Sequence, residues 1–242
     1  MLDELGSYTA SDFLLFSRET YFRTFELYNQ TYWPLHLLTA AAGGFVLYAL
    51  WYRREAAAAR LAWGLLAVLW AWVGWAFHLE RYATINLSAP YFAGLFAFGA
   101  LTILLAGVAA GAPGEGEREA GHSGTTAGPA PRAGAALLAY AILIHPLSGL
   151  LAGRAWTELS VFGMGPDPTV IGTMGAVLVL ASRIRRLILA VAVAWCLIST
   201  LTAYAMGSVE GIIPALSAVL VVTLSFYDGP LPRRRPRRPR RL

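Results

Sequence analysis

The sequence predicts an all-α integral membrane protein, a polytopic helical bundle with seven transmembrane helices. Of its 242 residues, 57% are hydrophobic and only 14% are charged, whereas about a quarter of the residues in soluble globular domains are charged. The chain also contains seven apolar runs that approach the roughly 20 residues a helix needs to cross a hydrocarbon core of about 30 Å. Open sheets are excluded there because lipid cannot satisfy exposed backbone groups.

The seven runs define the expected spans. They are Tyr32–Trp51, Leu61–Phe77, Tyr91–Gly111, Ala133–Leu151, Pro168–Ser182, Leu187–Met206 and Gly211–Tyr227. The fifth and seventh runs are short for a bilayer. Each of them therefore borrows flanking residues, thins the bilayer locally, or lies partly buried in protein.

Arginine distribution predicts the orientation of the bundle. All 19 basic residues are arginine, so no lysine Schiff base can form. With seven spans, one side holds 15 of them, seven within the last ten positions, and the other side holds only Arg18, Arg23, Arg81 and Arg154. Cytoplasmic loops retain the excess of basic residues. We therefore expect a multi-pass protein of the bacterial inner membrane, with its N-terminus outside and its C-terminus in the cytoplasm.

The chain divides into five segments by composition. Residues 1–31 form an external segment without signal-peptide features, in which Ser17 caps an interfacial helix bearing aromatic residues at helical spacing. Spans occupy residues 32–111 and 133–227. Residues 112–132, rich in Gly, Pro and Ala, form a flexible cytoplasmic linker. Residues 228–242 form a disordered Arg/Pro-rich tail, whose expected partners are anionic lipid head groups rather than nucleic acid.

Most ionisable residues in or beside the spans fall near the predicted outer ends. Such groups are costly in a membrane and usually face a bundle interior or a water-filled cavity. The sequence therefore predicts a ligand-binding pocket open to the external face. The alternative is that these side chains mark the span ends and are hydrated there. The candidate site residues are His36, His78, Glu80, Arg81, His145, Asp167 and Glu210.

His145 is the deepest of these groups, and Pro146 after it favours a kink. We expect His145 to need a polar partner at its depth, and therefore to converge with His78 and Asp167. Asp167 and Pro168 also fit the N-cap and first turn of the fifth span.

No metal or cofactor site is predicted. The histidines lack the spacing of a local metal motif, so a metal or a haem between His78 and His145 would require assembly across several spans. No Gly-rich nucleotide motif is present. The tryptophans of the second span favour packing and lipid contact over stacking of a quinone or pigment, and the single Cys196 favours buried packing.

Several motifs resemble an uncharacterised family of bacterial multipass membrane proteins, a domain of unknown function. The resemblance rests on four stretches and implies no activity, substrate or cofactor. These are Ser11–Ser17, Trp75–His78 leading to Arg81–Asn86, Phe162–Thr169, and Trp195–Ser199.

Three functions compete. The first is binding or transport of a small molecule through the external pocket. The second is an outer-leaflet enzyme with His78 or His145 as acid–base and Glu80 or Asp167 as its partner. The third is a structural or accessory membrane subunit. The sequence specifies neither the ligand nor the oligomeric state.

Overall fold

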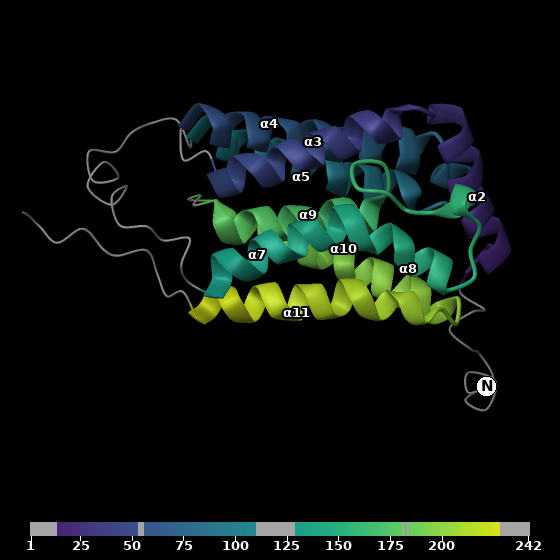
Figure 1. Cartoon of the computed structure of the whole chain (residues 1–242). Coiled ribbons are helices and arrows are strands. Elements are labelled where there is room, and N and C mark those ends of the chain that lie inside the picture. Colours follow the sequence, from purple (N-terminus) through teal and green to yellow (C-terminus); the bar gives the residue numbers. More distant parts are fainter. Residues whose placement is uncertain (1–13, 53–55, 110–128, 181, 183, 228–242) are drawn as a thin grey trace, which may run out of the picture.

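A computed structural model describes residues 14–52, 56–109, 129–180, 182 and 184–227. This part of the chain is helical and contains no strand. Long helices run side by side, and one further helix lies across one end of the bundle (Figure 1). The terminal segments 1–13 and 228–242, and most of the predicted linker, lie outside the described residues.

The helix across the end of the bundle is α2 (Arg18–Tyr32). It begins as predicted, with the Ser17 hydroxyl accepting a hydrogen bond from the Thr20 amide at 3.2 Å. It is followed by α3 (Leu35–Tyr52), with a 92° change of direction between them. The predicted first span at Tyr32 therefore begins three residues too early, because Tyr32 ends α2.

Helices lie close to the positions expected for the second and third spans. The helix α4 (Ala56–Trp72) continues into a π-helical segment, η2 (Val73–Leu79), which widens the turn at its end. A 3₁₀ turn, η3 (Tyr82–Thr84), leads to α5 (Ala89–Ala109). Pro90 lies in the first turn of α5, where a missing amide hydrogen costs nothing.

The helical segment at the predicted fourth span bends but does not break. It consists of α7 (Pro129–Ala139), a π-helical turn η5 (Tyr140–Ile144) and α8 (His145–Leu151). Pro146 explains the wide turn, because proline provides no amide hydrogen and clashes with the carbonyl four residues earlier. The helix α7 also includes the last residues of the predicted linker 112–132.

The remaining helices complete the bundle. After a 3₁₀ turn, η6 (Trp156–Glu158), the chain forms α9 (Pro166–Val179) and α10 (Arg185–Ala205). A short turn, η7 (Val209–Gly211), then leads to α11 (Ile212–Tyr227).

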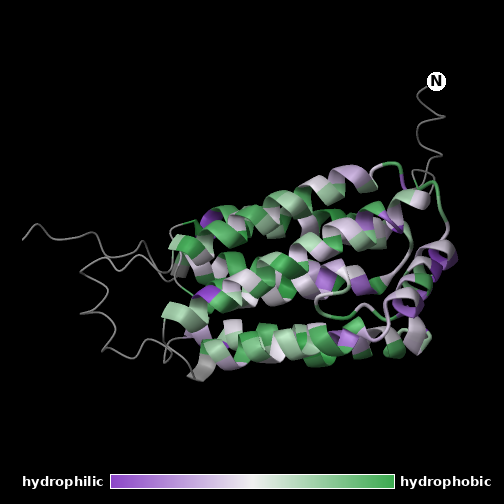
Figure 2. Ribbon diagram, turned by 90° about the horizontal axis from the view of Figure 1, so that it is seen from above, coloured by the Kyte–Doolittle hydropathy of each residue, from purple (hydrophilic) through white to green (hydrophobic). Residues whose placement is uncertain are grey.

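Five helical segments of the described chain are long and apolar enough to cross a membrane, or six if α2 and α3 count as one bent span. The ribbon is mainly hydrophobic along the bundle, and hydrophilic residues gather toward the end where α2 lies (Figure 2). The predicted fifth span is not among these six segments, because α9 has only 14 residues. The five segments are Ala56–Thr84, Ala89–Ala109, Pro129–Leu151, Arg185–Ala205 and Val209–Phe226.

The loop before α9 explains why this helix is short. Residues 159–165 fold back against the helices, and Phe162 and Met164 are completely buried. A side chain at Gly43 of α3 or Gly172 of α9 would meet the Phe162 ring at 2.9 Å or 2.5 Å. The loop thus occupies bundle length that helix would otherwise fill, and α9 is surrounded by protein.

Small residues set the closest helix contacts. Gly134 of α7 faces Gly175 of α9 so closely that a Cβ on either would lie 2.5 Å from the other's carbonyl oxygen. On the other side, Gly99 of α5 accommodates the ring of Trp70, whose indole nitrogen donates to the Thr173 hydroxyl at 2.8 Å. Such close approach is typical of helix packing in membranes. Trp63 and Trp70 are fully buried, in agreement with the packing interpretation of these tryptophans.

Candidate functional site

A polar cavity of about 40 Å³ lies at the α2 end of the bundle. Aromatic side chains of α2 form one wall, and polar groups from α8, the α8–α9 loop, α9, α10 and η7, together with the apolar Ala203, Met206 and Ile213, form the rest. Three of the predicted site residues, His145, Asp167 and Glu210, line it, together with Arg154, Ser160, Tyr21, Phe22, Phe25 and Ser199.

An ion pair closes one side of the cavity. Arg154 donates from Nη2 to Oε2 of Glu210 at 2.7 Å, and the two side chains are only 7% and 20% exposed. The guanidinium also lies over the Phe22 ring, 4.6 Å from its centroid. Gly149 leaves room for it, since a Cβ there would lie 2.5 Å from Nη2. The ion pair leaves Arg154 Nε and Glu210 Oε1 buried and without partners in the described structure.

The opposite side carries two further polar atoms without partners. His145 is 6% exposed, and its Nδ1 has no hydrogen-bond partner within the described residues. The same holds for the buried Ser160 hydroxyl, which lies so close to Gly165 that a Cβ there would be 2.0 Å from it. A buried polar group without a partner costs about 1–3 kcal/mol. Four such atoms belong to residues that line this one cavity.

Asp167 is positioned by a tryptophan. Its Oδ1 accepts a hydrogen bond from the Trp195 indole of α10 at 2.8 Å. The prediction that Asp167 caps the fifth span is wrong, because the N-cap is Gly165 and α9 begins at Pro166. Asp167 instead lies in the first turn of α9, where its negative charge interacts favourably with the positive end of the helix dipole. Its carboxylate remains free to contribute to the cavity.

Tyr21 contributes a neutral hydroxyl to the α2 wall. Burial raises the pKa of the Tyr21 phenol well above its ordinary value, so this group adds no charge. The ionisable side chains that line the cavity, besides Tyr21, are His145, Arg154, Asp167 and Glu210. The Arg18 guanidinium lies beside them, 5.6 Å from the centroid of the Phe22 ring.

His78 lies outside the residues that line this cavity. It is fully buried among aromatic rings, 4.8 Å from Phe96 and 4.9 Å from Trp195 between ring centroids, and neither ring nitrogen has a partner among the described residues. Its contact with Asp167 is thus indirect, through Trp195. Of the predicted trio, His145 and Asp167 meet at one cavity, and His78 packs behind it.

The other predicted site residues lie at the same end of the bundle and outside the cavity. His36 makes a hydrogen bond through Nε2 with Asn29 Oδ1 at 3.0 Å. Arg81 donates to the Thr31 hydroxyl at 2.6 Å, and Glu80 is exposed. His36 and Arg81 thus connect segments at the α2 end of the bundle, and Glu80 faces outward. Two residues of the enzyme hypothesis, His78 and Glu80, are therefore absent from the cavity wall.

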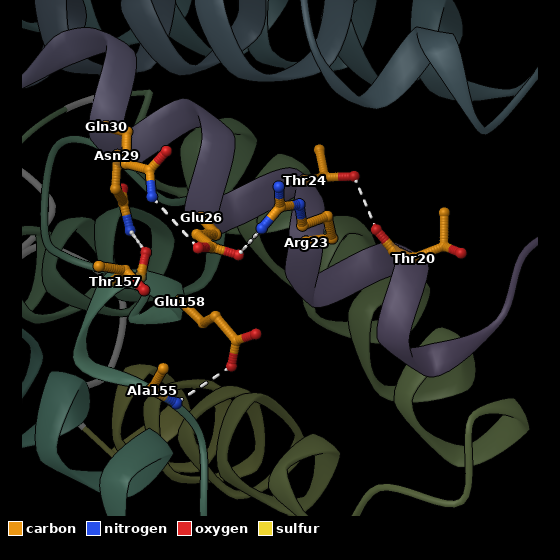
Figure 3. A network of polar contacts seen from close by, with 9 residues as sticks. All are labelled: Thr20, Arg23, Thr24, Glu26, Asn29, Gln30, Ala155, Thr157 and Glu158. Atoms are coloured by element: carbon orange, nitrogen blue, oxygen red, sulfur yellow. Dashed lines mark hydrogen bonds and ion pairs between the residues drawn. The ribbon is translucent and has the colours of Figure 1, made fainter.

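A network of polar contacts fixes α2 over the cavity (Figure 3). The Asn29 amide nitrogen donates to the carbonyl oxygens of Thr157 and Leu159, at 2.7 and 2.9 Å. Along α2, Glu26 accepts from Arg23 and Gln30. Asn29 thereby joins α2 to the loop that carries Arg154 and Ser160.

No group of three His, Cys, Asp or Glu residues in the described chain is close enough to hold a metal ion. The three acidic and imidazole groups of the cavity are therefore spaced around it rather than gathered on one point. This geometry fits hydrogen bonding to a small occupant better than metal ligation.

Sequence reasoning missed Arg154 and Ser160 as site residues. Arg154 counted only toward the external charge, because an arginine in a loop resembles a hydrated surface group. Its partner Glu210 follows far later in the chain. The one available signal was that Arg154 and Glu210 are oppositely charged residues beside spans on the predicted external side.

A protein-family model described as a family of unknown function, DUF6064, matches residues 18–234. The chain belongs to this family. The resemblance to a domain of unknown function is thus confirmed, and the match to DUF6064 assigns no activity. All residues that line the cavity lie within the part matched to DUF6064. No curated protein and no solved structure matches the chain.

Proposed function

We propose that this chain is a seven-pass protein of the bacterial inner membrane that binds a small polar solute in the cavity at the α2 end. In this proposal α9 is the fifth of the seven passes, enclosed by the other helices, and the α2 end faces outward. The 15-to-4 distribution of arginines supports the orientation.

One observation carries the proposed binding function. The unpartnered atoms His145 Nδ1, Arg154 Nε, Ser160 Oγ and Glu210 Oε1 belong to four residues around a single cavity. A buried polar network is expected to be satisfied, by protein or by a bound molecule. The cavity volume of about 40 Å³ accommodates a few water-sized groups. The solute is therefore small.

Binding is favoured over transport by the composition of the other half of the bundle. Toward the opposite end, the core of the described chain contains buried apolar side chains such as Leu66, Ile103 and Ala106. These apolar groups offer no hydrogen bonds to a polar solute. A transported solute would have to cross them, whereas a bound solute does not.

The test is solute-dependent stabilisation of the purified protein. Small anions, cations and neutral polar molecules would be screened for a saturable rise in the unfolding temperature, because a ligand that binds only the folded state stabilises it. His145→Ala should abolish the response, and His36→Ala, which changes a histidine outside the cavity at the same end, should keep it. Absence of any response, or an equal loss in both variants, would contradict the proposal.

A further inference from the structure

An open groove between α3 and α7 lies away from the α2 end of the bundle. Its volume is about 510 Å³. Three alanines of α7 line it together with Gly44 and Leu47 of α3, and Tyr48 and Arg132 complete the lining. The helix α3 runs away from the α2 end and α7 runs toward it, so Tyr48 and Arg132 both lie at the far end of the groove. The groove is therefore apolar along its length and polar at that end.

Small side chains leave the groove unfilled. An added Cβ at Gly43 would meet Phe162 at 2.9 Å and Ile142 at 3.0 Å, whereas nothing lies within 4 Å of one at the next residue, Gly44. The wall of α3 is thus packed at Gly43 and open at Gly44. On the other side of the groove, the alanines of α7 provide only methyl groups.

The walls of the groove suit a hydrocarbon chain. Alanine and leucine side chains offer no hydrogen bonds, so a polar solute would lose its hydration there without compensation. A hydrocarbon chain gains by covering the same apolar surface. On the outside of a membrane-spanning bundle, the hydrocarbon chains at hand are those of lipids.

Charge at this end of the bundle favours an anionic head group. The described helices begin there with Arg60 of α4, Arg132 of α7, and Arg185 and Arg186 of α10. All acidic residues of the described chain lie at the α2 end instead. They are Glu19, Glu26, Glu80, Glu158, Asp167 and Glu210.

The rest of the sequence at this end has the same sign. Residues 53–55, 110–128, 181, 183 and 228–242 connect or follow helices at the end away from α2, and together they hold eleven arginines and five acidic residues. Clustered arginines attract anionic lipid head groups, and the guanidinium group matches the geometry of a phosphate.

From these observations we infer that the groove between α3 and α7 binds one phospholipid whose head group carries a net negative charge. One acyl chain lies along Gly44, Leu47 and the alanines of α7, and the Arg132 guanidinium donates to the phosphate. Tyr48 lies at the boundary between chain and head group, where tyrosine is favoured. The inference goes beyond solute binding and rests only on the membrane location in the proposed function.

The test measures lipid binding to the purified full chain in detergent by native mass spectrometry. Phosphatidylglycerol, which is anionic, is compared with zwitterionic phosphatidylcholine carrying the same acyl chains. We expect saturable binding of one phosphatidylglycerol per chain, at least about tenfold tighter than phosphatidylcholine, as a charge-assisted contact provides.

Two variants with matched controls test the assignment of residues. Arg132→Gln should remove the preference for phosphatidylglycerol, whereas Arg186→Gln, which neutralises another exposed arginine of the same end, should retain it. Gly44→Leu should fill the groove and abolish binding of both lipids. Gly64→Leu adds the same side chain to α4 outside the groove, again with nothing within 4 Å of its Cβ, and should leave binding unchanged. Circular dichroism checks that all four variants keep the helical fold.

The outcomes separate this inference from the proposed function. Equal affinity for the two lipids, or a preference that survives Arg132→Gln, would overturn the head-group assignment and leave only general attraction to the arginines. Unchanged binding in Gly44→Leu, or no lipid bound to the full chain, would show that the groove is not a lipid site. A chain that does not enter bilayers at all would overturn the membrane location itself.

Discussion

Trp195 links the two polar regions of the α2 end. Its indole nitrogen donates to Asp167, and its ring packs against the buried His78. The tryptophan thus holds the carboxylate at the cavity while separating it from the histidine. This arrangement explains why His78 and Asp167 are neighbours without forming an acid–base pair.

Replacing Trp195 by phenylalanine should destabilise the protein. Trp195→Phe retains most of the aromatic packing and leaves Asp167 Oδ1 without its donor, which should lower the free energy of unfolding by about 1–3 kcal/mol. Trp75→Phe is the matched control, since Trp75 is 50% exposed. Denaturation of both variants in detergent measures the difference. Equal stabilities would show that the indole hydrogen bond contributes nothing.

Gly149 controls the position of the guanidinium. A methyl group there would lie 2.5 Å from Arg154 Nη2 and 2.8 Å from a methyl group of Leu159, so Gly149→Ala should displace Arg154 from Glu210. We expect solute binding to change while the helix persists, because alanine favours helix over glycine. Gly153→Ala would not serve as its control, since Gly153 has a φ of +81°. Gly64→Ala, where nothing lies within 4 Å of the added Cβ, is suitable. Unaltered binding in Gly149→Ala would contradict a role for the Arg154 position.

At the scale of elements, the positions of the helices were largely predictable from the sequence. The turns within and between the helices were not. Apolar runs of sufficient length located α4, α5, α10 and α11 to within a few residues, because a lipid environment requires helix along the entire run. The Ser17 cap was recognisable from local chemistry alone. The start of α9 was not, because Asp167 suits an N-cap locally but is drawn to Trp195 by tertiary packing.

The sequence predicted where in the bundle the candidate site lies, but it predicted only some of the residues that line the cavity. Counting polar residues near span ends identified His145, Asp167 and Glu210, since ionisable groups in a membrane need an interior cavity. The same reasoning included His78, although aromatic neighbours from distant helices enclose it. It omitted Arg154 because only the folded chain brings this residue to Glu210. The position of a residue along one helix gives no information about which residues of other segments it contacts.

Asn29 is expected to hold α2 over the cavity. Asn29→Ala removes its contacts with Thr157, Leu159 and His36 at once, and should increase amide hydrogen exchange in α2 while the central helices remain protected. Gln30→Ala changes the neighbouring amide, which contacts only Glu26 within α2, and should leave exchange near that of the wild type. Identical exchange in the two variants would refute the coupling of α2 to the loop.

Phe162 should be the most sensitive position of the inserted loop. The ring is completely buried between α3 and α9, so Phe162→Ala should reduce the free energy of unfolding by about 3–5 kcal/mol. Phe226→Ala removes a ring that is 82% exposed and provides the control. A small effect at Phe162 would mean that the loop lies outside the bundle.

At the scale of the whole molecule, the proposed topology predicts opposite locations for the two ends of the bundle. A reporter active only in the cytoplasm should be active after Leu242 or near Gly124, and silent near Ser88 or Glu158. Ser88 precedes α5 and Glu158 ends η6, both at the α2 end. Activity at Glu158 would contradict the seven-pass arrangement.

The proposed function places a polar cavity at one end of a bundle whose opposite half is apolar. This asymmetry favours a solute-binding role, and the interpretation as an accessory subunit stays a prediction that a partner screen would test. Since all cavity residues lie within the DUF6064 match, the arrangement is testable on the matched segment as well as on the full chain.

The most direct test is an experimental structure of the protein in lipid, determined with a solute that raises its unfolding temperature. The account predicts non-protein density in the cavity, within hydrogen-bond distance of His145 Nδ1, Ser160 Oγ and Glu210 Oε1. A cavity collapsed by direct pairing of these side chains with one another, and containing no density, would contradict it.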